Sequence, residues 1–249
     1  MALVNLGFFS EALGMQTTVE VIIPQKSTVG EIGTTNKAGG GEYKCLYLLH
    51  GLSDDQTIWM RRTSIERYAS EYGICVVMPC GGRSFYSDMK YGMNYYTYIA
   101  KELPEIIEEM FNVSSKREDR YIGGLSMGGY GALKMALKEE GRYAAAFGLS
   151  SVADIHNKAF TDTLKPVFDN NIPEDEDLFK LAVMHNNDAV KPRLYMTVGT
   201  DDFMYDDNVR LSTHFKGLDY DYQYVETDGT HSWALWDETV QQALCWMLK

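Results

Sequence analysis

Short apolar runs alternate with segments of helical periodicity along most of this 249-residue chain. Residues 43–49 form a nearly continuous apolar run, which is typical of a strand covered on both faces in a parallel sheet. Residues 98–111 instead place apolar side chains three and four positions apart, as a helix requires. The pattern predicts strands at 4–10, 17–23, 43–49, 74–78, 120–123, 143–149, 193–198 and 220–226, and helices at 63–72, 98–111, 130–138, 207–216 and 232–248.

The order of these elements predicts the fold class. Strands separated by helices indicate βαβ crossovers, and hence an α/β fold with a mostly parallel eight-stranded sheet flanked by helices. The first two strands have only a short turn between them, so we expect an antiparallel edge. The polar stretch 24–42 reads as a surface loop, and the irregular region 151–190 as a small insertion that partly caps the domain. We therefore expect one domain over 1–249.

Composition and charge narrow the class of protein. A hydrophobic fraction of 45% and a charged fraction of 23% are ordinary for a globular enzyme. The net charge of −12 argues against nucleic acid or an anionic membrane as the main partner, and no apolar stretch is long enough to span a bilayer. The amino terminus lacks the basic residues of a secretory signal, and the four cysteines show no C-x-x-C spacing, so we expect free thiols and a cytoplasmic location. The oligomeric state stays open, a homo-oligomer included.

A candidate nucleophile lies between a predicted strand and a predicted helix. The segment Gly124-Leu125-Ser126-Met127-Gly128 matches G-x-S-x-G, in which a sharp strand-to-helix turn exposes the serine hydroxyl. Such a turn brings the backbone close to neighbouring segments, so glycine is needed two residues before and after the serine. Both positions are glycine here, which favours a catalytic Ser126 over a chance glycine-rich turn.

Acyl transfer also needs hydrogen-bond donors for the oxyanion of the tetrahedral intermediate. The residue after the nucleophile, Met127, would supply one backbone N–H at the amino end of a helix. The turn after the 43–49 strand reads His50-Gly51-Leu52, so we expect the Leu52 N–H to be the second donor. His50 is predicted to be a structural hydrogen-bonding residue and not a base.

The base and its acid follow the last two predicted strands. Of the five histidines, His231 is the one on a loop after the last strand, directly before the final helix. The loop after the preceding strand contains Asp201 and Asp202, and Asp202 is the better candidate because it lies one residue deeper in the loop; Asp201 remains the alternative. The resulting order, Ser126, Asp202, His231, is that of the α/β-hydrolase fold.

The substrate contacts are less well defined than the catalytic groups. Aromatic residues that follow strand ends at the catalytic edge are candidates for a pocket wall, with packing as the competing interpretation. The acidic run 173–177 reads as a solvated helix start. The pocket candidates are Trp59, Tyr86 and Trp233, with Phe85, Tyr95 and Tyr96 as further members of the set.

The chain resembles the esterase D-like family, in particular its tributyrin-esterase and feruloyl-esterase branch. The resemblance covers nearly the whole chain and rests on motifs that are specific in combination, which lie at 48–55, 82–88, 102–104, 124–131, 199–203 and 231–237. It implies carboxylester hydrolysis without a metal or cofactor, and it supports Asp202 as the acid. S-formylglutathione hydrolases are relatives with the same triad, but their cysteine-containing stretch after the His-Gly turn is replaced here by Leu52-Ser53-Asp54-Asp55-Gln56.

These observations predict a serine carboxylesterase that hydrolyses short-chain acyl or aryl esters, including carbohydrate-linked ones. The predicted partner is a small-molecule ester. Two alternatives share the same catalytic residues: an S-formylglutathione hydrolase-like thioesterase, and an acyltransferase in which an alcohol outcompetes water. A metallohydrolase is disfavoured because no two histidines have ligand spacing.

Overall fold

The computed structural model describes residues 1–26, 30, 32, 33, 35, 37 and 41–249, so most of the predicted loop at 24–42 lies outside the described residues. In the described part of the chain, eight strands form one sheet in the order β1-β2-β4-β3-β5-β6-β7-β8. The strands are β1 (Ala2–Ser10), β2 (Met15–Ile23), β3 (Cys45–Leu49), β4 (Cys75–Pro79), β5 (Arg120–Leu125), β6 (Ala145–Leu149), β7 (Arg193–Gly199) and β8 (Tyr222–Thr227).

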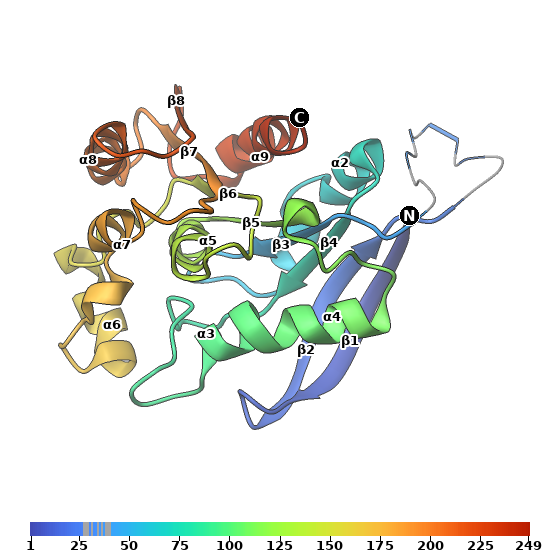
Figure 1. Cartoon of the computed structure of the whole chain (residues 1–249), viewed down its shortest axis with the longest axis horizontal. Coiled ribbons are helices and arrows are strands. Elements are labelled where there is room, and N and C mark those ends of the chain that lie inside the picture. Colours follow the sequence, from blue (N-terminus) through green and yellow to red (C-terminus); the bar gives the residue numbers. More distant parts are fainter. Residues whose placement is uncertain (27–29, 31, 34, 36, 38–40) are drawn as a thin grey trace.

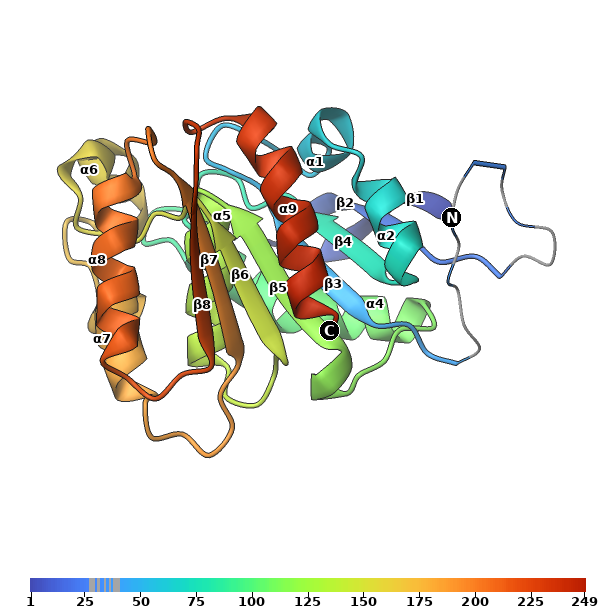
Figure 2. The same ribbon diagram turned by 90° about the horizontal axis from the view of Figure 1, so that it is seen from above.

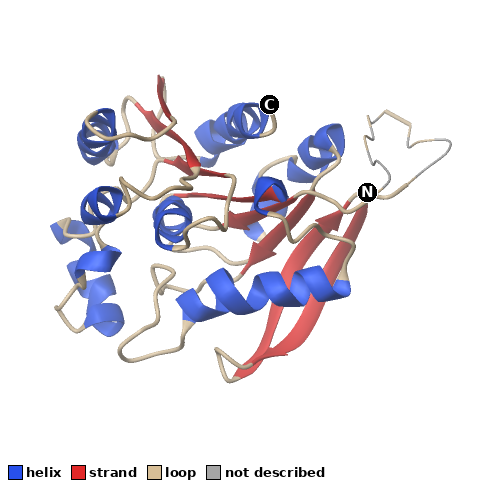
Figure 3. Cartoon of the chain, in the orientation of Figure 1, coloured by secondary structure: helices blue, strands red, loops and turns tan. Residues whose placement is uncertain are grey.

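Strand directions confirm the predicted fold class. Every neighbouring pair in the series β4-β3-β5-β6-β7-β8 is parallel. By contrast, β1 pairs with β2, and β2 with β4, in antiparallel register. The predicted antiparallel edge is therefore correct, and Figure 3 shows it as a long hairpin at one side of the molecule. Because β3, β5 and β7 run in one direction, their carboxyl ends meet at one edge of the sheet. The loops at this edge carry the candidate catalytic residues.

Helices cover both faces of the sheet (Figures 1 and 2). One core lies under α1, α2 and α9, and a larger one lies under α4, α5 and α8 on the opposite face. The α-helices are α1 (Ile58–Arg62), α2 (Ile65–Tyr72), α3 (Tyr95–Thr97), α4 (Leu103–Met110), α5 (Met127–Lys138), α6 (Thr161–Phe168), α7 (Leu178–Met184), α8 (Tyr205–Lys216) and α9 (Trp233–Met247). A π-helix, η1 (Tyr98–Glu102), and three 3-10 turns, η2 (Arg117–Asp119), η3 (Lys158–Phe160) and η4 (Glu174–Glu176), complete the described elements.

Several predicted boundaries were wrong, and each has a local cause. Helix α5 begins at Met127 and not at residue 130, because its glycine-rich first turn is packed tightly against β3. Strand β5 continues to Leu125, since Gly123 and Gly124 still pair with β6. Helix α1 was not predicted, as five residues carry too little periodicity to be recognised.

The region predicted to be irregular, 151–190, contains η3, α6, η4 and α7. Helix α7 packs against α5 and α8, and α6 lies further from the sheet than α7 (Figure 1). Among the described residues, no helix has both the length and the apolar character needed to cross a membrane.

Candidate active site

Ser126 occupies the turn between β5 and α5 in a backbone conformation that side chains rarely adopt, with φ 52° and ψ −117°. Hydrogen bonds hold this turn from both sides: the Ser126 N–H donates to the Leu149 carbonyl at 2.9 Å, and the Ser126 carbonyl accepts from Val152 at 3.1 Å. A Cβ on Gly124 would lie 2.6 Å from the Gly128 backbone, and one on Gly128 would overlap the Leu49 carbonyl. The two motif glycines are therefore required by close backbone approach, as the sequence pattern predicted.

Three side chains from separate loops form a continuous hydrogen-bonded chain. Ser126 Oγ lies 3.1 Å from His231 Nε2, and His231 Nδ1 lies 3.0 Å from both carboxylate oxygens of Asp202. Ser126 follows β5, Asp202 follows β7, and His231 precedes α9, so the sheet edge brings together residues 105 and 29 positions apart. This is the arrangement in which an imidazole can take the serine proton while a carboxylate fixes its tautomer.

The two candidate acids have different surroundings. The Asp202 side chain is fully buried and also accepts a hydrogen bond from the Met204 N–H at 2.8 Å, whereas Asp201 is exposed. Burial alone would raise the pKa of Asp202, but hydrogen bonds from His231, the Met204 backbone and Ser150 hold it below its ordinary value. A buried, ionised carboxylate beside the imidazole is what the role requires, so the geometry favours Asp202 over Asp201.

Aromatic rings hold the imidazole of His231 on two sides. Phe203 lies with its ring centroid 4.5 Å away, and Trp236 packs edge-on at 4.8 Å. The Trp236 indole N–H donates to Ser150 Oγ, so the ring is itself anchored. Neither residue was singled out from the sequence, although Phe203 directly follows the acid and Trp236 lies one helical turn after Trp233.

The two predicted oxyanion donors lie at the same cavity as Ser126. Neither the Leu52 nor the Met127 N–H has an acceptor among the described residues, so both are available to a ligand. Met127 is the first residue of α5, where the N–H has no intrahelical partner. Gly51 lets the loop that carries Leu52 approach Ser126 closely, since a Cβ on Gly51 would lie 3.8 Å from Ser126 Cβ.

His50 is a structural residue, as its position before the turn predicted. Its buried ring accepts a hydrogen bond from the Gly81 N–H at Nε2 and donates from Nδ1 to the Gly51 carbonyl. Burial lowers its pKa, which keeps the ring neutral and preserves this pair of bonds. Because the C=O and N–H of a trans peptide point in opposite directions, fixing the Gly51 carbonyl also fixes the Leu52 N–H.

The cavity above Ser126 is small and mainly apolar, with a volume of about 200 Å³. Its walls come from four loops and from the insertion, which contributes Val152 and Phe160. The Phe160 ring packs edge-on against Phe85 at 5.6 Å. The lining residues are Gly51, Leu52, Ser53, Asp54, Phe85, Leu125, Ser126, Met127, Val152, Phe160, Phe203, His231, Trp233 and Trp236.

Two of the three named pocket candidates do not line this cavity. Trp59 is fully buried, donates from its indole N–H to the Leu49 carbonyl, and packs against Trp233. Tyr86 is also fully buried, with its hydroxyl donating to the His50 carbonyl. Both rings support the wall from behind, and only Trp233 faces the cavity as predicted. Of the further candidates, Phe85 lines the cavity, whereas Tyr95 and Tyr96 do not.

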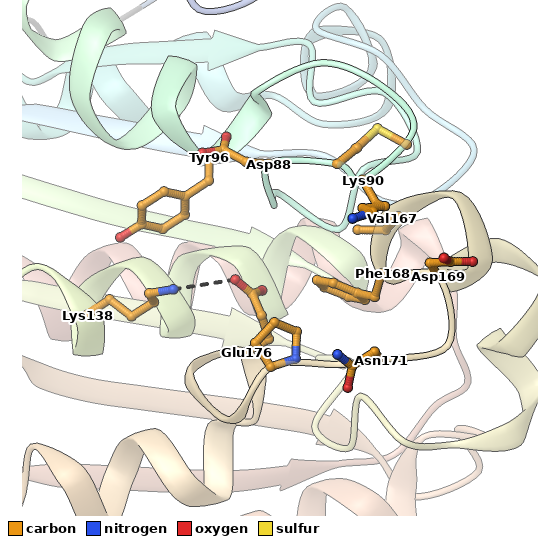
Figure 4. Close-up of a pocket in the computed structure, with 11 residues that line it drawn as sticks. Asp88, Lys90, Tyr96, Lys138, Val167, Phe168, Asp169, Asn171 and Glu176 are labelled. Carbon is orange, nitrogen blue, oxygen red and sulfur yellow. Dashed lines mark hydrogen bonds and ion pairs between the residues drawn. The ribbon is translucent and has the colours of Figure 1, made fainter.

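A second, larger cavity of about 380 Å³ lies between the loop at 88–90 and the insertion (Figure 4). Lys138 and Glu176 form an ion pair at one end, and Phe168 and Asn171 lie at the other. Behind Glu176, the fully buried ammonium of Lys134 contacts its carboxylate at 2.6 Å and also donates to the Phe85 carbonyl. The acidic run 173–177 is thus not simply a solvated helix start, because Glu176 is buried in an ion pair.

Comparison with known proteins agrees with the fold. The esterase family model matches residues 10–247. An acetyl esterase of Caldicellulosiruptor saccharolyticus is 30% identical over 269 aligned positions, which cover 100% of this chain and 99% of that protein. A mouse S-formylglutathione hydrolase is 30% identical over 58% of this chain and 57% of its own.

Two solved structures from Staphylococcus aureus are similar over the whole chain at 34% identity. One is fluorophosphonate-binding serine hydrolase F with substrate bound, with a TM-score of 0.88 and coverage of 100% of this chain and 98% of that one. The other is the S-formylglutathione hydrolase FrmB without ligand, with a TM-score of 0.87 and coverage of 100% and 99%.

The fold and the similar structures together show that this chain is an α/β-hydrolase and that its relatives include serine hydrolases. The chain belongs to the esterase family and is a carboxylic ester hydrolase, a serine carboxylesterase. The resemblance to esterase D-like proteins noted from the sequence is confirmed.

Proposed function

We propose that this esterase hydrolyses carboxylic esters of short acyl groups, with Ser126, His231 and Asp202 as its catalytic triad. The observation that carries the proposal is the hydrogen-bonded chain of these three side chains at the floor of a small apolar cavity. The acetyl esterase relative supports a short acyl group, since the two proteins match over essentially their whole length.

The geometry supports a two-step acyl transfer. His231 Nε2 accepts the hydroxyl proton as Ser126 Oγ attacks the ester carbonyl, while Asp202 stabilises the imidazolium that forms. The N–H groups of Leu52 and Met127 donate to the oxyanion. The imidazolium then protonates the departing alcohol, and water hydrolyses the acyl-enzyme with His231 again acting as base.

The size of the cavity supports the short-chain preference. About 200 Å³ has to hold both the acyl group and part of the alcohol. Phe85 and Phe160 line the cavity on one side and Trp233 and Trp236 on another, so we expect a long acyl chain to fit less well between these rings than an acetyl group. We therefore expect acetyl and propionyl esters to be hydrolysed with a higher kcat/KM than octanoyl esters.

A second candidate activity is hydrolysis of S-formylglutathione. It is favoured by the similarity to the staphylococcal S-formylglutathione hydrolase over the whole chain, and a formyl group would fit the cavity. The same triad can cleave a thioester, so the catalytic residues do not distinguish the two substrates. An acyltransferase would also use them, and would be recognised by acyl transfer to added alcohols.

Kinetics on a panel of 4-nitrophenyl esters from acetate to octanoate, with S-formylglutathione alongside, tests the proposal. S126A should lose about 10⁴-fold or more in kcat while keeping the circular dichroism and Tm of the wild type. Ser53 also lines the cavity but lies outside the hydrogen-bonded chain, so S53A is the matched control and should retain activity within a few-fold. A fully active S126A, or a preferred octanoyl ester, would contradict the assignment, and a dominant thioester rate would favour the second candidate.

We further propose a small-molecule ester as the partner and the cytoplasm as the location. The cytoplasmic location is supported by the cysteines: all four lie in the described part of the chain and are free thiols, two of them buried.

A further inference from the structure

One carboxylate lies in the wall of the cavity without a role in the proposed triad. Asp54 lines the cavity together with Ser126 and His231. Among the described residues that line it, Asp54 and His231 are the only titratable ones. His231 is assigned to proton transfer, so Asp54 is the one acidic side chain among the described residues that line this cavity.

Asp54 is close to the reacting serine. A Cβ placed on Gly51 would lie 3.1 Å from Asp54 Oδ2 and 3.8 Å from Ser126 Cβ, so the carboxylate and the serine lie no further apart than the sum of these distances. The loop is held in this position by the Asp54 N–H, which donates to the Gly51 carbonyl at 3.3 Å. An ester bound over Ser126 therefore occupies the same small cavity as the Asp54 carboxylate.

The Asp54 carboxylate has no hydrogen-bond or ion-pair partner in the described part of the chain. Its neighbour Asp55, by contrast, accepts hydrogen bonds from both the N–H and the hydroxyl of Thr57. Asp202 is bonded to His231 and Met204. Asp54 neither caps a helix nor pairs with a basic residue among those described, so its charge and its acceptor oxygens remain available to a bound molecule.

We propose that Asp54 determines the charge selectivity of this esterase, favouring esters of uncharged, hydroxyl-bearing or cationic alcohols and disfavouring anionic substrates. The proposal rests on the ester hydrolysis proposed above and names the class of alcohol. A hydroxyl group on the substrate can donate to Asp54, whereas a second carboxylate would lie beside it in a largely apolar cavity. Glutathione thioesters carry two carboxylates and one ammonium, so Asp54 disfavours them.

Three acetate esters of one phenol framework test the proposal: 4-acetoxybenzoate is anionic, 4-acetoxybenzamide is neutral, and (4-acetoxyphenyl)trimethylammonium is cationic. For each enzyme, the ratio of kcat/KM for a charged ester to that for the neutral one cancels general effects on catalysis. D54N should raise the anionic-to-neutral ratio by about 3- to 10-fold, as expected for two unit charges about 7–10 Å apart in a partly solvated site, and should lower the cationic-to-neutral ratio. Added salt should reduce the difference between wild type and D54N.

D55N is the matched control, because it removes one negative charge from the same loop at a residue that does not line the cavity. Asparagine can keep the hydrogen bonds to Thr57 through its carbonyl oxygen. Ratios that are equal in wild type and D54N, or that shift equally in D54N and D55N, would overturn the role of Asp54 while leaving the esterase assignment intact. A wild type that fails to hydrolyse the neutral ester would overturn both.

Discussion

The cavity at Ser126 and the cavity between the 88–90 loop and the insertion differ in size and in the state of their polar groups. The second cavity is about twice as large, yet its carboxylates are already bonded: Asp88 to Thr97, Asp169 to Tyr91, and Glu176 to Lys134. At the smaller cavity, the N–H groups of Leu52 and Met127 have no acceptor among the described residues. The Asp54 carboxylate there has no hydrogen-bond donor among them either. Unsatisfied hydrogen-bonding capacity beside Ser126, and not volume, is the feature that distinguishes the candidate active site.

The largest expected effect comes from neutralising the acid bonded to His231, compared with neutralising an acid that lines the larger cavity. D202N keeps the shape of the side chain but can donate a hydrogen bond to His231, which favours the wrong imidazole tautomer, so kcat should fall about 10⁴-fold. D88N in the larger cavity should change kcat less than about threefold. Both are measured with the same short-chain ester. D201N distinguishes the two candidate acids, and a D201N loss as large as that of D202N would contradict the assignment.

The second effect concerns the buried ion pair between Glu176 and Lys134 beside the larger cavity. E176Q leaves the Lys134 ammonium buried without its carboxylate, so the free energy of unfolding should fall by about 3–5 kcal/mol. Urea denaturation followed by circular dichroism measures this loss. E174Q is the matched control, because it breaks an exposed pair with Lys180 and should change stability little. Equal stability of E176Q and wild type would show that the ion pair does not hold the insertion to α5.

The smallest effect concerns acyl-chain length. F160A removes the ring that the insertion places in the smaller cavity, so kcat/KM for hexanoyl relative to acetyl esters should rise about tenfold. F179A is the control within the same insertion, since Phe179 packs against His214 and is absent from the cavity wall. An unchanged chain-length profile in F160A would contradict the proposal that this ring limits the acyl group.

The catalytic half of the site was predictable because its residues follow the ends of recognisable strands. Ser126, Asp202 and His231 lie after β5, β7 and β8, where parallel topology alone brings them to one edge. The G-x-S-x-G spacing added a steric requirement that the structure reproduces at Gly124 and Gly128.

The pocket wall was less predictable, because sequence position does not reveal which way a side chain points. Phe85 and Tyr86 are adjacent and both have positive φ, yet one ring faces the cavity and the other is buried under His50. Phe160 lies in a segment without periodicity, so no signal linked it to the site. The burial of Glu176 was equally hidden, because its partner Lys134 is 42 residues away on α5.

Covalent labelling tests directly whether Ser126 is the nucleophile. Wild-type protein treated with a fluorophosphonate probe, digested and analysed by mass spectrometry should carry one adduct, on the peptide containing Ser126. S126A should carry none, and H231A should be labelled far more slowly because Ser126 loses its base. We expect the adduct at the smaller cavity. Labelling of S126A at the wild-type rate, or an adduct on a residue of the larger cavity, would contradict the assignment of Ser126 as nucleophile.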